Sequence, residues 1–82
     1  MSDLQIKICG VKDKEIAMHA IDAGANFVGF IFYEKSHRNI TVENCEQILS
    51  DIKDLIIPVA VTVNPDDKLL DDLSRIGFQY IQ

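Results

Sequence analysis

The spacing of apolar and polar residues changes several times along the chain. Residues 4–9, LQIKIC, alternate between apolar and polar positions, which is typical of a strand with one buried face. Residues 27–32, FVGFIF, and 56–63, IIPVAVTV, are short apolar runs rich in aromatic and β-branched residues, and they predict two buried strands. A fourth strand is predicted to begin within residues 78–82, FQYIQ.

Between these strands the apolar residues recur at helical spacing. The three predicted helices carry three apolar stripes, formed by Ile16, Ala17, Ala20 and Ile21, by Val42, Cys45, Ile48, Leu49 and Ile52, and by Leu69, Leu70, Leu73 and Ile76. Asp13, Thr41 and Asn64 are the predicted N-caps, because a side-chain oxygen can accept from the free amides of a first turn. Gly24 is expected to end the first helix in the left-handed conformation, and Gly77 is expected to stop the third helix.

The element order βαβαβαβ predicts an α/β fold. Right-handed crossovers would make the sheet parallel, which suits either a doubly wound open sheet or part of a (βα)8 barrel. An open sheet normally covers its last strand with a helix, whereas this chain ends in its fourth strand. Since a barrel takes about 250 residues, we expect residues 1–82 to be a single partial (βα)8-barrel domain. It would comprise the first three and a half βα units.

Composition narrows the function classes. The chain is 48% hydrophobic and 26% charged, with a net charge of -5, and its eight Lys and Arg residues are scattered. Nothing forms the basic stripe of a nucleic-acid-binding protein, and no apolar run of membrane-spanning length occurs. The first residues lack the layout of a signal peptide, so we expect a cytoplasmic protein with two free thiols.

The first predicted strand carries the candidate chemistry. Side chains alternate between the two faces of a strand. The polar face therefore carries Gln5, Lys7 and Cys9, and the apolar face carries Leu4, Ile6 and Ile8. If the apolar face meets the helices, Cys9 lies at the carboxyl end of the polar face, where (βα)8 barrels have their active sites. A thiol acts as a base only as a thiolate, which a nearby cation such as Lys7 would favour. A lone cysteine is more often a packing residue.

Four segments, in order, resemble the N-terminal part of the phosphoribosylanthranilate isomerase family. They are KICG at 7–10, DAGANFVGFIFYEKSHR at 22–38, VAVTVN at 59–64 and YIQ at 80–82. This family is a (βα)8-barrel enzyme of tryptophan biosynthesis, and it rearranges an aminoaldose phosphate to an aminoketose phosphate. The chain departs from the family pattern at His37, where a proline is common, and at Thr62, where a phenylalanine is usual.

The resemblance implies roles for four residues. Cys9 would be the general base that removes the C2′ proton of the ring-opened sugar. Arg38 would pair with the anthranilate carboxylate, and Gln82 and Lys7 would line the substrate pocket. The family's general-acid aspartate and phosphate-binding loops belong to the second half of the barrel, so we expect these 82 residues to be inactive alone. The implied substrate is a small phosphorylated aminosugar, with no cofactor and no metal.

The sequence also allows a second interpretation, in which the chain is not catalytic. A βαβαβαβ unit leaves its first and fourth strands as free edges, and exposed edges pair with other chains. The chain would then be an assembly module that forms a homo-oligomer or joins a complementing C-terminal half. A flavodoxin-like binding domain is disfavoured, because no glycine-rich phosphate loop follows the first strand.

Overall fold

The computed structural model describes residues 5–52 and 54–82 of the chain. Strands and helices alternate in the order β1 (Lys7–Cys9), α1 (Lys14–Asp22), β2 (Phe27–Phe32), α2 (Val42–Ile52), β3 (Ile57–Thr62), α3 (Asp67–Arg75) and β4 (Tyr80–Ile81). The strands form one sheet in the order β1-β2-β3-β4, and every neighbouring pair is parallel. The predicted βαβαβαβ unit is confirmed.

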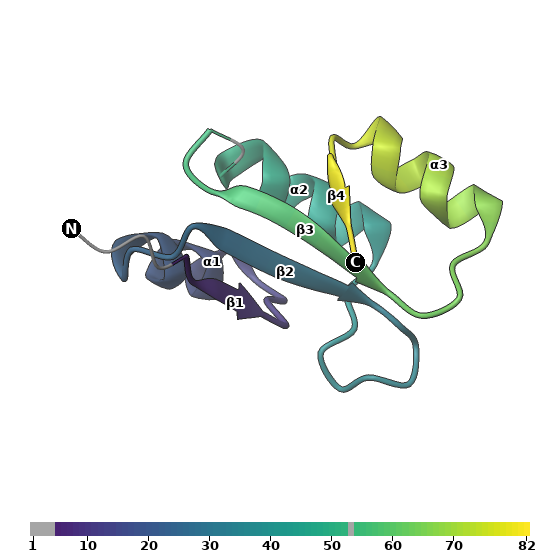
Figure 1. Cartoon of the computed structure of the whole chain (residues 1–82), viewed down its shortest axis with the longest axis horizontal. Coiled ribbons are helices and arrows are strands. Elements are labelled where there is room, and N and C mark those ends of the chain that lie inside the picture. Colours follow the sequence, from purple (N-terminus) through teal and green to yellow (C-terminus); the bar gives the residue numbers. More distant parts are fainter. Residues whose placement is uncertain (1–4, 53) are drawn as a thin grey trace.

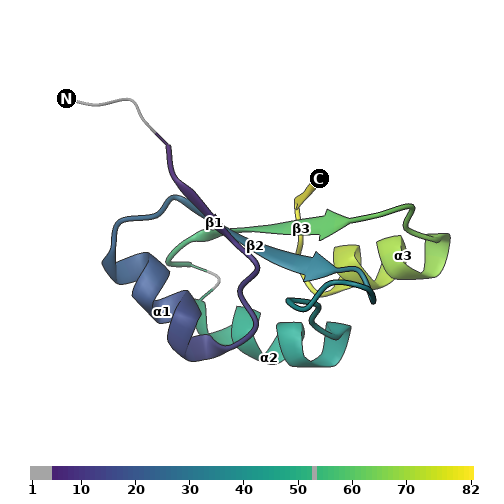
Figure 2. The ribbon, with the colours of Figure 1, turned by 90° about the horizontal axis from the view of Figure 1, so that it is seen from below.

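All three helices lie on one side of the sheet (Figures 1 and 2). The core fills the space between the two layers, where Phe30 of β2, Ile52 of α2 and Leu73 of α3 are completely buried. Phe78, just before β4, packs edge-on against Phe30 with ring centroids 6.1 Å apart. The other side of the sheet, here called the open face, is covered by none of the described elements (Figure 2).

Local capping signals account for most helix ends. The Asp13 carboxylate accepts from a first-turn amide of α1 at 2.8 Å, and the Thr41 hydroxyl does the same for α2 at 3.2 Å. Gly24 and Gly77 follow α1 and α3 with φ of 87° and 111°, the left-handed conformation in which glycine ends helices at least cost. These four predictions are confirmed.

The predicted cap of the third helix is wrong. Asn64 has a φ of 46°, which belongs to a turn and is incompatible with the extended backbone of an N-cap. The cap is Asp66, whose carboxylate accepts from the Leu69 amide at 2.8 Å. Asparagine tolerates the left-handed region, so Asn64 serves the turn that leaves β3, and α3 starts two residues later than an Asn64 cap would allow.

The outer elements are shorter or more exposed than the pattern predicts. β1 begins at Lys7 rather than at residue 4, which lies outside the described residues, and β4 has only two residues. Ile16 of α1 is 44% exposed, and Leu70 of α3 is only partly buried. α1 and α3 are the outer helices of the layer, and each has a helix beside it on one side only (Figure 1).

No helix in residues 5–52 and 54–82 is long and apolar enough to cross a membrane.

Candidate active site at the carboxyl end of β1

The Cys9 thiol lies on the open face. Ile8 packs against the core on the helix side, so strand alternation directs its neighbours Lys7 and Cys9 the opposite way. Cys9 pairs in register with Gly29 of β2, and a Cβ at Gly29 would lie 3.0 Å from the Cys9 Sγ. The thiol is therefore half-buried against the backbone of β2, at the end of its own strand.

The β2–α2 loop brings Arg38 to this strand end. Its side chain lies across Gly10, where an added Cβ would be 2.5 Å from the Arg38 Cδ. The Arg38 Nη1 donates a long hydrogen bond of 3.4 Å to the Cys9 carbonyl oxygen. Gly10 itself has a φ of 83°, so it makes the turn after Cys9 and leaves room for the guanidinium. Two residues that are 29 positions apart in the sequence thus meet at one strand end.

Two further residues hold the loop in place. The Lys12 Nζ donates to the His37 carbonyl oxygen at 3.1 Å and so ties the β2–α2 loop to the turn after β1. The Ser36 Oγ accepts from the Arg38 amide at 3.1 Å and fixes the backbone next to the guanidinium. Sequence reasoning assigned neither residue. Ser36 had a signal, because it lies within segment 22–38, which resembles the isomerase family, whereas Lys12 lies outside the four resembling segments.

Lys7 and Gln82 form a second group on the open face. The Lys7 Nζ donates to the Gln82 Oε1, which joins β1 to the end of β4 across the two strands between them. The Gln82 backbone is held by Ala60, whose carbonyl accepts from its amide at 2.7 Å, and by Thr62, whose amide donates to its carbonyl at 3.0 Å. The ammonium that was predicted to favour the Cys9 thiolate thus has Gln82 as a direct partner.

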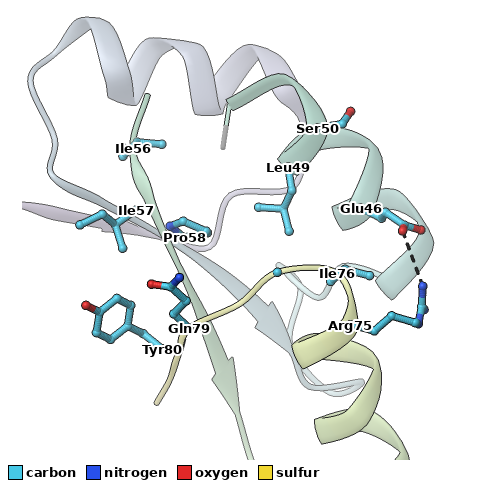
Figure 3. Close-up of a pocket in the computed structure, with 11 residues that line it drawn as sticks. Glu46, Leu49, Ser50, Ile56, Ile57, Pro58, Arg75, Ile76, Gln79 and Tyr80 are labelled. Atoms are coloured by element: carbon cyan, nitrogen blue, oxygen red, sulfur yellow. Dashed lines mark ion pairs between the residues drawn. The ribbon is translucent and has the colours of Figure 1, made fainter. Parts of the chain in front are cut away.

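A pocket of about 410 Å³ lies at the opposite end of the strands (Figure 3). Its walls are the starts of β3 and β4, the end of α3 and one side of α2. Arg75 and Glu46 form an ion pair of 3.6 Å at its rim. Because Ile57 and Tyr80 belong to the amino ends of their strands, this pocket is separate from the group around Cys9.

The two cysteines have contrasting surroundings. Cys45 of α2 is completely buried, and burial raises the pKa of its thiol to about 12. Such a thiol is inert, since only the thiolate is a nucleophile or a base. Cys45, which lies on the predicted apolar stripe of the second helix, is thus a core residue. Within the two described ranges, no three His, Cys, Asp or Glu side chains are grouped closely enough to hold a metal ion.

Comparison of the sequence with models of known protein families shows which family the chain is related to. A family model described as N-(5'phosphoribosyl)anthranilate (PRA) isomerase matches residues 6–82. The chain belongs to this isomerase family. A curated N-(5'-phosphoribosyl)anthranilate isomerase from Brucella canis is 43% identical over 72 residues, which are 88% of this chain and 32% of the relative. The chain therefore spans about a third of the length of the curated relatives it matches.

Solved structures of the isomerase family superpose closely on the chain. The structure of monomers generated from the dimeric isomerase of Thermotoga maritima has a TM-score of 0.87 and 35% identity, and the match covers 96% of this chain and 40% of that one. An isomerase in complex with reduced 1-(O-carboxyphenylamino)-1-deoxyribulose 5-phosphate has a TM-score of 0.89 and 35% identity, covering 96% and 41%. The fold is the N-terminal part of a (βα)8 barrel, as predicted, and not a doubly wound sheet.

Proposed function

We propose that the chain supplies the N-terminal part of an enzyme that rearranges N-(5-phosphoribosyl)anthranilate to the corresponding 1-deoxyribulose phosphate. The observation that carries the proposal is the meeting of Cys9 and Arg38 at the carboxyl end of β1, in a chain of the isomerase family. A base and a carboxylate-binding cation are groups that this reaction needs. We propose in addition that residues 1–82 form a single partial domain, that the protein is cytoplasmic, and that it binds neither nucleic acid nor membrane.

Cys9 acts in the proton-transfer step. Once a general acid has opened the ribose ring, C2′ lies next to a protonated carbon–nitrogen double bond, which makes its proton acidic. The Cys9 thiolate takes this proton, the C2′–H electron pair forms the C1′–C2′ double bond, and the former C–N π pair moves onto nitrogen. The resulting enol then accepts a proton at C1′ and releases the proton of its C2′ hydroxyl, which leaves the ketone at C2′. The general acid is expected from the part of the barrel beyond these residues.

Arg38 binds the aromatic end of the substrate. A guanidinium has five N–H donors and holds a carboxylate through two parallel hydrogen bonds. The long bond of 3.4 Å to the Cys9 carbonyl leaves most of these donors for a ligand. The ligand named for one solved relative carries a carboxyphenyl group, the kind of group that Arg38 would hold. Lys7 and Gln82 line the substrate pocket on the open face.

Completing the barrel tests this function. Residues 1–82 are joined to the part of the Thermotoga maritima relative that lies beyond the matched region, and this chimera is called the completed barrel. We expect it to isomerise the substrate, measured by chromatography of substrate and product. The isolated chain should show no turnover, since loss of a general acid alone costs about 10²–10⁴-fold. A folded completed barrel without activity would contradict the proposal, and so would an active isolated chain.

A second candidate function is assembly with another copy or with a complementing C-terminal half. Two large apolar side chains at strand starts, Ile57 and Tyr80, are 41% and 51% exposed. β1 and β4 are edge strands, which offer unpaired backbone groups to a partner. One solved relative is described as derived from a dimeric isomerase. These observations support association through the open face and its two edges.

Sedimentation of the isolated chain over a range of concentrations tests assembly. We expect a dimer or larger species at high concentration, and we expect Tyr80→Lys to weaken it by putting a charge among apolar contacts. Leu55→Lys is the matched control, because Leu55 is 57% exposed but lies in the α2–β3 turn. A monomer throughout the range, or equal effects of the two lysines, would contradict assembly through the open face.

A further inference from the structure

The Cys9 thiol packs closely against the position where a side chain at residue 29 would begin. A Cβ built on Gly29 would be 3.0 Å from the Cys9 Sγ and 3.3 Å from its Cα, closer than ordinary van der Waals contact. Gly29 has no positive φ, unlike Gly10, so its backbone conformation does not call for glycine. A glycine inside a strand weakens it and often marks a close approach. Here that close approach is made by Cys9.

The backbone of Gly29 also holds the turn behind the thiol. Its carbonyl oxygen accepts from the Gly10 amide at 2.9 Å and from the Val11 amide at 3.0 Å. Val11 is completely buried, so this turn is anchored in the core. One residue of β2 therefore determines both the space for the Cys9 side chain and the path of the backbone that follows it.

We propose that Gly29 is a positioning residue for the Cys9 thiol, which deepens the proposed function and rests on it for the role of that thiol. The absence of a Cβ lets the Sγ pack against the backbone of β2 and keeps it in one orientation on the open face. An alanine at position 29 would push the Sγ away from β2, while the carbonyl bonds to Gly10 and Val11 would keep the turn. The thiol would remain but would be aimed differently.

A double-mutant cycle on the 82-residue chain tests the steric link. Gly29→Ala should lower the midpoint of urea unfolding in the parent chain, and it should lower it less in the Cys9→Ala variant, because the Sγ that the new methyl group meets is gone. Equal shifts in the two backgrounds would overturn the proposal. The test still works if Gly29→Ala is only weakly folded, because it compares the shift in unfolding midpoint in the parent chain with the shift in the Cys9→Ala chain.

Alkylation by iodoacetamide, located by mass spectrometry, reports the thiol itself. In Gly29→Ala the Cys9 rate should rise as the thiol moves toward the open face, while buried Cys45 stays unreactive and so reports an intact fold. Gly24→Ala is the matched control. It makes the same change at a strained φ of 87° with no atom within 4 Å, so it should lower stability without changing the relative Cys9 rate. An unchanged Cys9 rate in Gly29→Ala would overturn the proposal.

Kinetics of the completed barrel separate positioning from general damage. Gly29→Ala should lower kcat by about 10- to 100-fold and leave KM nearly unchanged, because a reacting group displaced by a fraction of an ångström loses its alignment. Gly24→Ala should leave both constants close to those of the parent. If the parent completed barrel is inactive, the proposed function fails, whereas the cycle and the alkylation rates still decide whether Gly29 positions Cys9.

Discussion

Cys9→Ala is expected to lower kcat of the completed barrel by about 10²–10⁴-fold, the range for loss of a general base. The fold should persist, since the half-buried thiol contributes little packing and the change should cost about 1 kcal/mol or less. Circular dichroism and urea unfolding of the 82-residue chain check the fold, and steady-state kinetics of the completed barrel check the rate. A large loss of kcat with an intact fold is the signature of a chemical role.

Three further variants, one at Cys9 and two at Arg38, separate the roles of these two residues. Cys9→Ser keeps a hydrogen-bonding group of similar size, but a serine hydroxyl, unlike a thiol, hardly ionises near neutral pH, so this variant should be nearly as slow as Cys9→Ala. Arg38→Ala should act mainly on KM, because it removes the partner of the substrate carboxylate, and Arg38→Lys should rescue it only in part, since an ammonium lacks the planar fork. Activity of Cys9→Ser close to that of the parent would contradict the general-base assignment.

Those parts of the fold that depend on local patterns could be predicted from the sequence. Alternation and helical spacing gave the element order, and Asp13 and Thr41 revealed two caps because a cap depends on a few neighbouring residues. Asn64 was misassigned because an asparagine before a helix fits a cap and a left-handed turn equally well. Only the backbone, with φ of 46°, distinguishes the two.

The candidate site could be predicted only in part, since it is made by contacts between distant segments. The family motif singled out Cys9 and Arg38, but the register of β1 on β2, which brings them together, is a property of the sheet. The bond from Lys12 to the His37 carbonyl joins two loops and leaves no periodic trace in the sequence. Lys7 is predicted to lie beside the thiol, yet its long side chain reaches Gln82 at the end of the far strand.

The buried thiol of Cys45 is expected to make the folded chain less stable at alkaline pH. Burial in the core raises its pKa from the ordinary value of 9.0 to about 12, whereas in the unfolded chain the thiol is hydrated and ionises near the ordinary value. Between these two values the native state keeps a proton that the unfolded state releases. Unfolding therefore becomes easier as pH rises, and the stability that is fully present below pH 9.0 is lost progressively toward about pH 12.

We expect this single group to lower the free energy of unfolding by up to about 4 kcal/mol at the end of that range, at 1.36 kcal/mol for each pH unit of difference between the two states. Urea unfolding at a series of pH values from 8 to 11 measures the slope. Cys45→Ala is the comparison: it costs stability at every pH through the cavity it leaves, but its stability should fall less steeply above pH 9, because all other titrating groups are shared. Parallel slopes would mean that the thiolate is accommodated in the folded chain and that the core around α2 opens to water, contrary to the complete burial of Cys45.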